Sequence, residues 1–167
     1  ESEGPFRPAA AAYGPVVSRE KRQEPPHAGR ARMSSKTEWG KKCLNVLKGV
    51  KQNKSAWIFA APVDAEALKI PDYHQVIKRP MDLGTVKTNM DNGVITTPDQ
   101  FKDDVLLTFK NAMQYNPPGH DVHNTAKMLM EVFNSKWEPQ EAAIFEKYRT
   151  ESTGGGGVFG GGGGGGG

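Results

Sequence analysis

Apolar side chains recur every three or four residues in four segments of the chain, which is the spacing of helices with one buried face. The first segment carries them at Trp39, Cys43, Val46, Leu47 and Val50. Ser35 and Glu38 match a capping box in front of this segment. The pattern therefore predicts a helix that begins there and ends at about Gln52.

Two shorter patterns follow, each with clear boundary signals. Asp82 is a good N-cap for a second helix, which carries Leu83, Val86 and Met90 on one face and ends before Gly93. Thr97 and Gln100, with Pro98 between them, mark the start of a third helix. Its apolar residues are Phe101, Val105, Leu106, Phe109, Ala112 and Met113. Because two prolines follow Asn116, the third helix is expected to end there.

A fourth helix is predicted to begin near Asp121, which we interpret as its cap. Its apolar positions are Val122, Ala126, Leu129, Val132, Phe133 and Trp137. Pro139 interrupts the pattern, so EAAIFEKYR (residues 141–149) is expected to form a separate short helix. Because no segment alternates with period two, the sequence predicts an all-α protein, a four-helix bundle.

The connection between the first two helices is too long for an ordinary loop. It runs from Asn53 to Pro80 and contains three prolines, the last of them Pro80 itself. Its apolar residues are Trp57, Ile58, Phe59, Val63, Leu68, Ile70 and Tyr73. A solvated linker would not carry so many apolar side chains, so this long first loop is predicted to be functional.

Composition separates the ends of the chain from this bundle. The 20 glycines and 12 prolines exceed what one compact domain of 167 residues needs. Residues 1–33 form a basic arm rich in alanine and proline, and residues 151–167 form a glycine-rich tail. We expect both to be disordered and the domain to occupy residues 34–150.

Charge is distributed unevenly along the chain. Residues 1–36 carry seven Lys or Arg and four Asp or Glu, a difference of +3 that equals the net charge of the whole chain. The predicted bundle is therefore close to neutral, which disfavours a nucleic-acid interface on its own surface. The sequence shows no membrane span or secretory leader, and its single cysteine fits a reducing compartment.

Two long motifs resemble the bromodomain, most closely the bromodomain and extra-terminal class with its plant and algal relatives. They are WIFAAPVDAEALKIPDYHQVIKRPMDLGTV in the long loop and second helix, and FKNAMQYNPPGHDV at the end of the third helix. The resemblance covers about 100 residues and omits both tails. It implies a left-handed four-helix bundle whose long first loop frames a pocket for acetyl-lysine.

The resemblance also implies a role for individual residues. Asn116 matches the asparagine whose amide donates to the acetyl carbonyl, Tyr73 matches the tyrosine that reaches the same oxygen through a water, and Tyr115 lines the pocket. The implied apolar wall is Val63, Leu68 and Ile70, with Val122 at the small aliphatic gatekeeper position. Trp57, Ile58 and Phe59 match a tryptophan-proline-phenylalanine shelf, from which Ile58 departs.

Acetylation turns a hydrated ammonium into a neutral amide with a methyl end, so a reader needs an apolar slot and one well-placed donor. Each of these residues also has a purely structural interpretation. Asn116 alone reads as a turn residue at a helix end, and Trp57 and Phe59 alone read as core. The matched motifs favour the pocket, and we expect Trp57 and Phe59 to be partly exposed. Trp39, Phe109, Phe133 and Trp137 are interpreted as packing.

Catalytic and metal chemistry find little support in the sequence. His120, Asp121 and His123 fit no standard zinc spacing. Asp103 and Asp104 are adjacent on a helix and suit a solvated face, and Cys43 lies in an apolar stripe where an inert thiol is expected. The glycine runs lack the lysine of a phosphate loop. We expect no enzyme activity, no metal and no cofactor.

Two functions of different class follow from the sequence. The favoured one is a monomeric, nuclear reader of acetylated histone tails that targets a chromatin or transcription regulator. The alternative is a nucleic-acid-associated structural module whose basic N-terminal arm contacts DNA weakly and without sequence preference.

Overall fold

The structure is a computed structural model that describes residues 33–154. Residues 1–32 of the predicted arm and 155–167 of the predicted tail lie outside this range. Residues 151–153, which the sequence assigned to the tail, form the end of α5 instead. The described elements, in chain order, are η1 (Ser34–Lys36), α1 (Glu38–Lys51), η2 (Ala56–Phe59), α2 (Tyr73–Val76), α3 (Leu83–Asp91), α4 (Pro98–Tyr115) and α5 (Asp121–Thr153).

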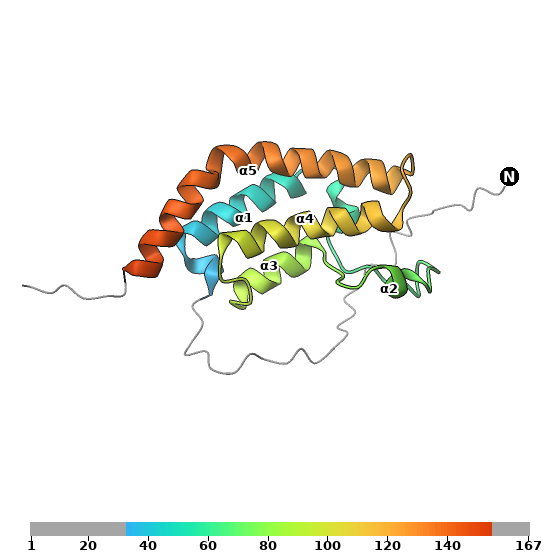
Figure 1. Ribbon diagram of the computed structural model, residues 1–167, viewed down its shortest axis with the longest axis horizontal. Helices are drawn as coiled ribbons and strands as arrows, with labels where there is room; N and C mark the ends of the chain where they lie inside the picture. The colour runs from blue at the N-terminus through green and yellow to red at the C-terminus, as the bar shows by residue number, and fades with distance from the viewer. Residues whose placement is uncertain (1–32, 155–167) are drawn as a thin grey trace, which may run out of the picture.

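Four helices, α1, α3, α4 and α5, pack side by side as a bundle (Figure 1). Every regular element within residues 33–154 is helical, so the predicted all-α four-helix bundle is confirmed. The two short elements η2 and α2 lie in the long loop between α1 and α3, where the sequence pattern predicts no regular element. Figure 1 shows α2 beside the carboxyl end of α4, at one end of the bundle.

The core confirms the predicted packing residues. Trp39, Phe109, Phe133 and Trp137 are all buried, and Phe101 stacks on Trp137 with ring centroids 5.8 Å apart. Cys43 is fully buried, and burial raises the pKa of its thiol to about 12. The predicted inert thiol is therefore what the structure shows. No helix among the described residues is long and apolar enough to cross a membrane.

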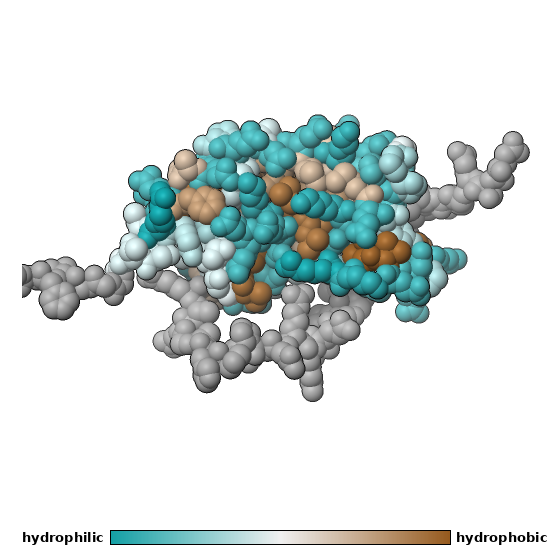
Figure 2. Space-filling model, viewed as in Figure 1, coloured by the Kyte–Doolittle hydropathy of each residue, from teal (hydrophilic) through white to brown (hydrophobic). Residues whose placement is uncertain are grey.

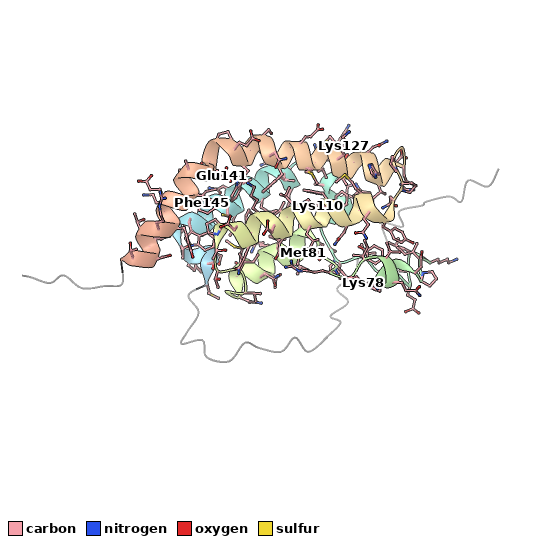
Figure 3. The ribbon with its side chains drawn as sticks, in the orientation of Figure 1. Lys78, Met81, Lys110, Lys127, Glu141 and Phe145 are labelled. Carbon is pink, nitrogen blue, oxygen red and sulfur yellow. The ribbon has the colours of Figure 1, made fainter. Side chains whose placement is uncertain are left out.

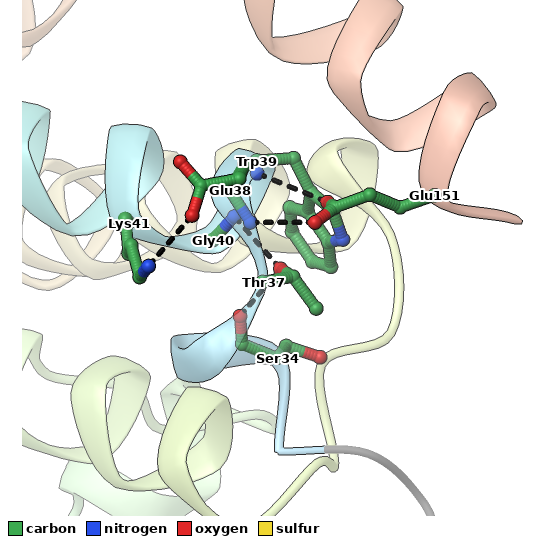
Figure 4. A network of polar contacts seen from close by, with 7 residues as sticks. All are labelled: Ser34, Thr37, Glu38, Trp39, Gly40, Lys41 and Glu151. Atoms are coloured by element: carbon green, nitrogen blue, oxygen red, sulfur yellow. Dashed lines mark hydrogen bonds and ion pairs between the residues drawn. The ribbon is translucent and has the colours of Figure 1, made fainter. Parts of the chain in front are cut away.

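The start of α1 differs from the predicted capping box. Thr37, not Ser35, is the N-cap, and its Oγ1 accepts a hydrogen bond of 3.0 Å from the backbone N–H of Gly40 (Figure 4). Residues Ser34–Lys36 instead form the 3-10 turn η1. Threonine is itself a strong cap, and in this position it lies directly before the first helical residue.

The predicted starts of the next two helices are confirmed. The Asp82 side chain caps α3 through the backbone N–H of Thr85, and Thr97 caps α4 through that of Gln100. Pro98 occupies the first turn of α4, and Gly93 has the positive φ of 69° expected just past the end of α3. In a capping box the Gln100 side chain would accept from the backbone N–H of Thr97. Here its Oε1 accepts from the backbone N–H of Thr96 instead.

The predicted break in the last helix is wrong. α5 continues from Asp121 to Thr153 with Pro139 inside it, so residues 141–149 are not a separate helix. Figure 1 shows α5 bending along its length, as a helix with an internal proline does. Trp137 and Ile144, buried on either side of Pro139, hold both halves against the bundle.

The cap of α5 is also not the predicted one. His120 is the N-cap, and its Nδ1 accepts from the backbone N–H of Val122 at 3.1 Å. Asp121 is instead the first helical residue. Sequence preferences favour aspartate over histidine as a cap, and here the turn geometry after Gly119, with φ of 91°, places the imidazole in the capping position.

Candidate functional site

Asn116 lies where α4 ends, as the two prolines after it predict. Its backbone is extended, with φ of −99° and ψ of 129°, and its Nδ2 donates to the backbone carbonyl of Ala112 at 2.9 Å. An amide nitrogen carries two hydrogens, so this contact leaves one for a ligand. The side chain is thus oriented by the helix end and keeps a donor.

His123 holds the backbone that carries Asn116. Its Nδ1 lies 2.9 Å from the carbonyl oxygen of Asn116 and 3.2 Å from that of Met113. Because both partners are acceptors, Nδ1 must carry the proton. His123 therefore joins the first turn of α5 to the last turn of α4, a role that its position in the sequence did not reveal.

Two tyrosines stand beside this helix end. The rings of Tyr73 and Tyr115 meet edge to face with centroids 5.1 Å apart, and the Tyr115 hydroxyl donates to Asp72 at 2.8 Å. Tyr73 is only 5% exposed, and burial raises the pKa of its phenol to about 12. The Tyr73 hydroxyl is therefore neutral at any physiological pH and remains a donor.

The apolar residues expected to form the pocket wall are half-buried. They are Val63, Leu68, Ile70 and Val122, and Val122 packs against the core cluster. Ile70 is tied to Tyr73 directly, because its carbonyl accepts from the Tyr73 backbone N–H at 3.0 Å. Lys69 has φ of 56°, a left-handed conformation that is unusual for a non-glycine residue. This bend separates Leu68 from Ile70 and turns the chain towards α2.

The three residues that match the shelf are not equally exposed. Trp57 is 45% exposed, as expected, and Ile58 is half-buried. Phe59, at 7%, is buried and meets Phe109 of α4 edge to face at 5.4 Å, so its expected exposure is wrong. Because η2 is a 3-10 helix, successive side chains point in different directions, and only one of the two aromatics reaches solvent.

One polar stripe on α4 was missed. Asp104, Asn111 and Tyr115 recur at helical spacing and all contact the loop segment that leads from Asp72 to Arg79. Asp104 is only 4% exposed and forms an ion pair of 2.5 Å with Arg79, so its expected place on a solvated face is wrong. Asp104 and Asn111 are seven positions apart and therefore lie on the same face of the helix, and this spacing could have indicated their shared role.

A second buried carboxylate lies at the start of α3. Asp82 is 3% exposed, and burial raises its pKa, although the hydroxyl and backbone N–H of Thr85 oppose that shift by stabilising the charge. It lies close enough to Tyr73 to contribute to the raised pKa of that phenol.

Solvent-exposed hollows lie elsewhere on the described surface. One is lined by Ala65, Glu66, Lys69 and Pro71 on the loop, and another by residues of η1, α1 and the end of α5. The face shown in Figure 2 is mostly hydrophilic, with a hydrophobic patch between α2 and the carboxyl end of α4. No group of three potential metal ligands occurs within residues 33–154.

The structure is an all-helical bundle whose long first loop packs Tyr73 on Tyr115, next to the asparagine that ends α4. This is the class of domain that the two sequence motifs resemble. The chain belongs to the bromodomain family, since the family model described as Bromodomain matches residues 43–128, just over half of the chain. The resemblance seen in the sequence is therefore confirmed.

Its relatives include plant transcription factors. The chain is 50% identical over 101 residues to Transcription factor GTE3, chloroplastic, and 48% identical over 97 residues to Transcription factor GTE5, chloroplastic, both of Arabidopsis thaliana. These matches cover 60% and 58% of the chain. They span 22% and 20% of those relatives, about a fifth of their length. A third relative, Transcription factor GTE10, is 36% identical over 156 residues, or 86% of the chain and 15% of that protein.

Proposed function

We propose that this domain is a reader of acetylated lysine on histone tails. The observation that supports the proposal most strongly is the side-chain amide of Asn116, which donates to the Ala112 carbonyl at the end of α4 and directly follows Tyr115, on which Tyr73 packs. His123 bonds to the backbone carbonyl of the same asparagine. A neutral donor next to apolar and aromatic side chains suits a neutral acetyl amide.

The chemistry of the site favours acetyl-lysine over lysine. Val63, Leu68, Ile70, Tyr73, Tyr115, Asn116 and Val122 include no carboxylate. An ammonium that entered among them would lose its hydration without gaining a counter-charge, whereas the acetyl carbonyl would accept from Asn116. Asp82 is already engaged by the hydroxyl and backbone N–H of Thr85 as the cap of α3. Asp72 already accepts from the Tyr115 hydroxyl. It would therefore stay at the rim, where it could attract basic residues that flank the modified lysine.

A reader performs no chemical step on its ligand, so we propose that the domain is not an enzyme and needs no cofactor. It would act as a monomer that targets a longer regulator to chromatin, in keeping with the word transcription factor in the names of its relatives. Because the proposed ligands are histone tails, the domain would act in the nucleus. Two of the relatives are nevertheless named chloroplastic, so localisation of the full-length protein is a direct check of this point.

The test is a calorimetric titration with two histone peptides that differ by one acetyl group. The acetylated peptide should bind and the unmodified one should not. Asn116→Ala should lose about 1 to 3 kcal/mol of binding free energy, because the carbonyl enters the pocket without a donor. Asn92→Ala, at an exposed position at the end of α3, is the matched control and should bind like the parent.

Two outcomes would contradict the proposal. Equal affinity of the parent for both peptides would remove the reader function, and unchanged binding by Asn116→Ala would remove the role of that amide. Asp72→Asn and Asp121→Asn should retain the preference for the acetylated peptide, because neither acid is needed to reject the ammonium.

A further inference from the structure

One side of α4 holds the loop segment that carries Tyr73. This segment, residues 72–79, is called the latch segment below. Four side chains of α4 reach it: Asp104 pairs with the Arg79 guanidinium at 2.5 Å, Asn111 donates to the Arg79 carbonyl at 2.8 Å, Gln114 donates to the Val76 carbonyl at 3.3 Å, and Tyr115 donates to the Asp72 carboxylate at 2.8 Å.

These contacts are unevenly buried. Asp104 and Asn111 are both buried, whereas Gln114 is exposed and Tyr115 only half-buried. The side chain of Asp104 is 6% exposed and that of its partner Arg79 is 66% exposed. A buried carboxylate requires a partner to offset its lost hydration, so the pair with Arg79 is the contact least easily replaced by water.

Besides these polar contacts, two buried side chains attach the latch segment to the fold. Ile77 and Tyr73 are its buried side chains, and the remaining residues from Asp72 to Arg79 are exposed. Its internal hydrogen bonds are local: the Ile77 N–H donates to the Tyr73 carbonyl at 2.8 Å, and the N–H groups of Gln75 and Val76 donate to Asp72. Local bonds keep the turn in shape but do not fix its position on α4. Figure 3 shows Lys78 near α2 and Met81 where the chain reaches α3, with Lys110 on the neighbouring α4.

We propose that the Arg79–Asp104 pair, assisted by Asn111, is a latch that sets the position of Tyr73 and thereby the affinity of the site. Arg79 and Asp104 are positioning residues that do not touch the ligand. Opening the latch frees the segment from α4, and binding then carries the cost of ordering it again. The effect on affinity rests on the proposed reader function, whereas the effect on the segment does not.

The chain supplies matched controls for both partners. Arg79→Gln and Asp104→Asn remove one charge each from the latch, and Lys78→Gln and Asp103→Asn remove the same charges from exposed neighbours. The double variant Arg79→Gln/Asp104→Asn completes a cycle. Hydrogen exchange of the backbone N–H groups of Tyr73, Gln75, Val76 and Ile77 is measured by NMR on the full chain, with core amides of α1 as the reference for global unfolding.

Exchange of the latch segment should accelerate roughly tenfold in Arg79→Gln while the α1 amides change little, because only the segment opens. Asp104→Asn should act in the same direction, and the double variant should fall short of the product of the two single effects, since both remove one interaction. Affinity for the acetylated peptide should fall about three- to tenfold in the same variants. Both control variants should match the parent in exchange and in binding.

The proposal is overturned if exchange of the latch segment in Arg79→Gln and Asp104→Asn follows that of the controls, or if the segment loosens without any loss of peptide affinity. If the parent itself binds no acetylated peptide, the reader function fails, but the exchange data on the free protein still decide whether the latch exists.

Discussion

Asn116 shows how a single residue gains a function from its place at a helix end. The two prolines after it force α4 to stop, and the freed amide then bonds to Ala112 one turn back. Taken alone, this is the behaviour of any turn asparagine. Its carbonyl, however, is also fixed from α5 by His123, so both ends of the residue are held.

His123 should therefore matter for binding although it is not expected to touch the ligand. His123→Leu removes the donor to Met113 and Asn116, and we expect it to weaken acetyl-peptide binding and to lower the free energy of unfolding, by about 1 kcal/mol in each case. His123→Asn places an amide N–H close to the position of Nδ1 and should restore most of both losses. Calorimetry and urea denaturation of the two variants provide the measurement. Equal binding by His123→Leu and the parent would show that Asn116 is held well enough by Ala112 alone.

Among the elements, α1 and α5 meet through an unusual cap. The Glu151 carboxylate, near the end of α5, accepts from the backbone N–H groups of Glu38 at 2.9 Å and Trp39 at 3.3 Å (Figure 4). These are N–H groups that have no acceptor within α1. A negative charge there also complements the positive end of the helix dipole, and the edge-to-face contact of Trp39 with Tyr148 adds apolar packing.

Removing this cap should destabilise the fold without affecting the site. Glu151→Ala is expected to lower the free energy of unfolding by about 1 kcal/mol, the usual cost of losing a helix cap. Glu146→Ala, at an exposed position of the same helix, should change it by no more than a few tenths. Urea denaturation compares the two variants, and peptide titration should show unchanged affinity. If Glu151→Ala and Glu146→Ala had the same free energy of unfolding, water would cap α1 as well as Glu151 does.

Local sequence signals predict some of the helix boundaries correctly and others not. Caps at Asp82 and Thr97 and the stop at Asn116 are set by neighbouring residues, and the structure confirms them. Thr37 and His120 competed with nearby residues of similar or better capping preference, and packing decided between them. The continuation of α5 through Pro139 depends on burial of both halves of that helix, which no local pattern reports.

At the candidate site, too, some features follow from the sequence motifs and others depend on tertiary contacts. The motifs pointed to Asn116, Tyr73 and Tyr115, and in the structure Tyr73 packs edge to face on Tyr115, the residue before Asn116. Their role as a binding site stays a prediction. The burial of Phe59 against Phe109 and the pairing of Asp104 with Arg79 depend on where the loop meets α4. Such contacts join residues 25 or more positions apart, so they follow from tertiary structure and not from neighbouring residues.

At the scale of the whole molecule, the candidate site and the two ends of the described chain, Met33 and Gly154, lie at opposite ends of the bundle (Figure 1). The carboxyl end of α4 and α2 form one end, and the start of α1 and the end of α5 form the other. The described chain begins at Met33 and ends at Gly154, beside the Glu151 cap. The arm therefore joins the fold far from Asn116.

This arrangement leads to a prediction for the basic arm. Residues 1–33 carry six Lys or Arg and four Asp or Glu, so deleting them lowers the net charge of the chain by two. We expect affinity for an acetylated histone peptide at moderate salt to stay within about twofold, because the arm joins the fold at the end away from the site and distant charges are screened. Any weak attraction of the full chain to DNA should fall on deletion and should also fall with added salt. Parallel titrations of both chains with peptide and with a DNA duplex at two salt concentrations make the comparison. If deletion abolished peptide binding while the circular dichroism of the bundle was unchanged, the arm would be part of the binding site and the domain would begin before residue 34.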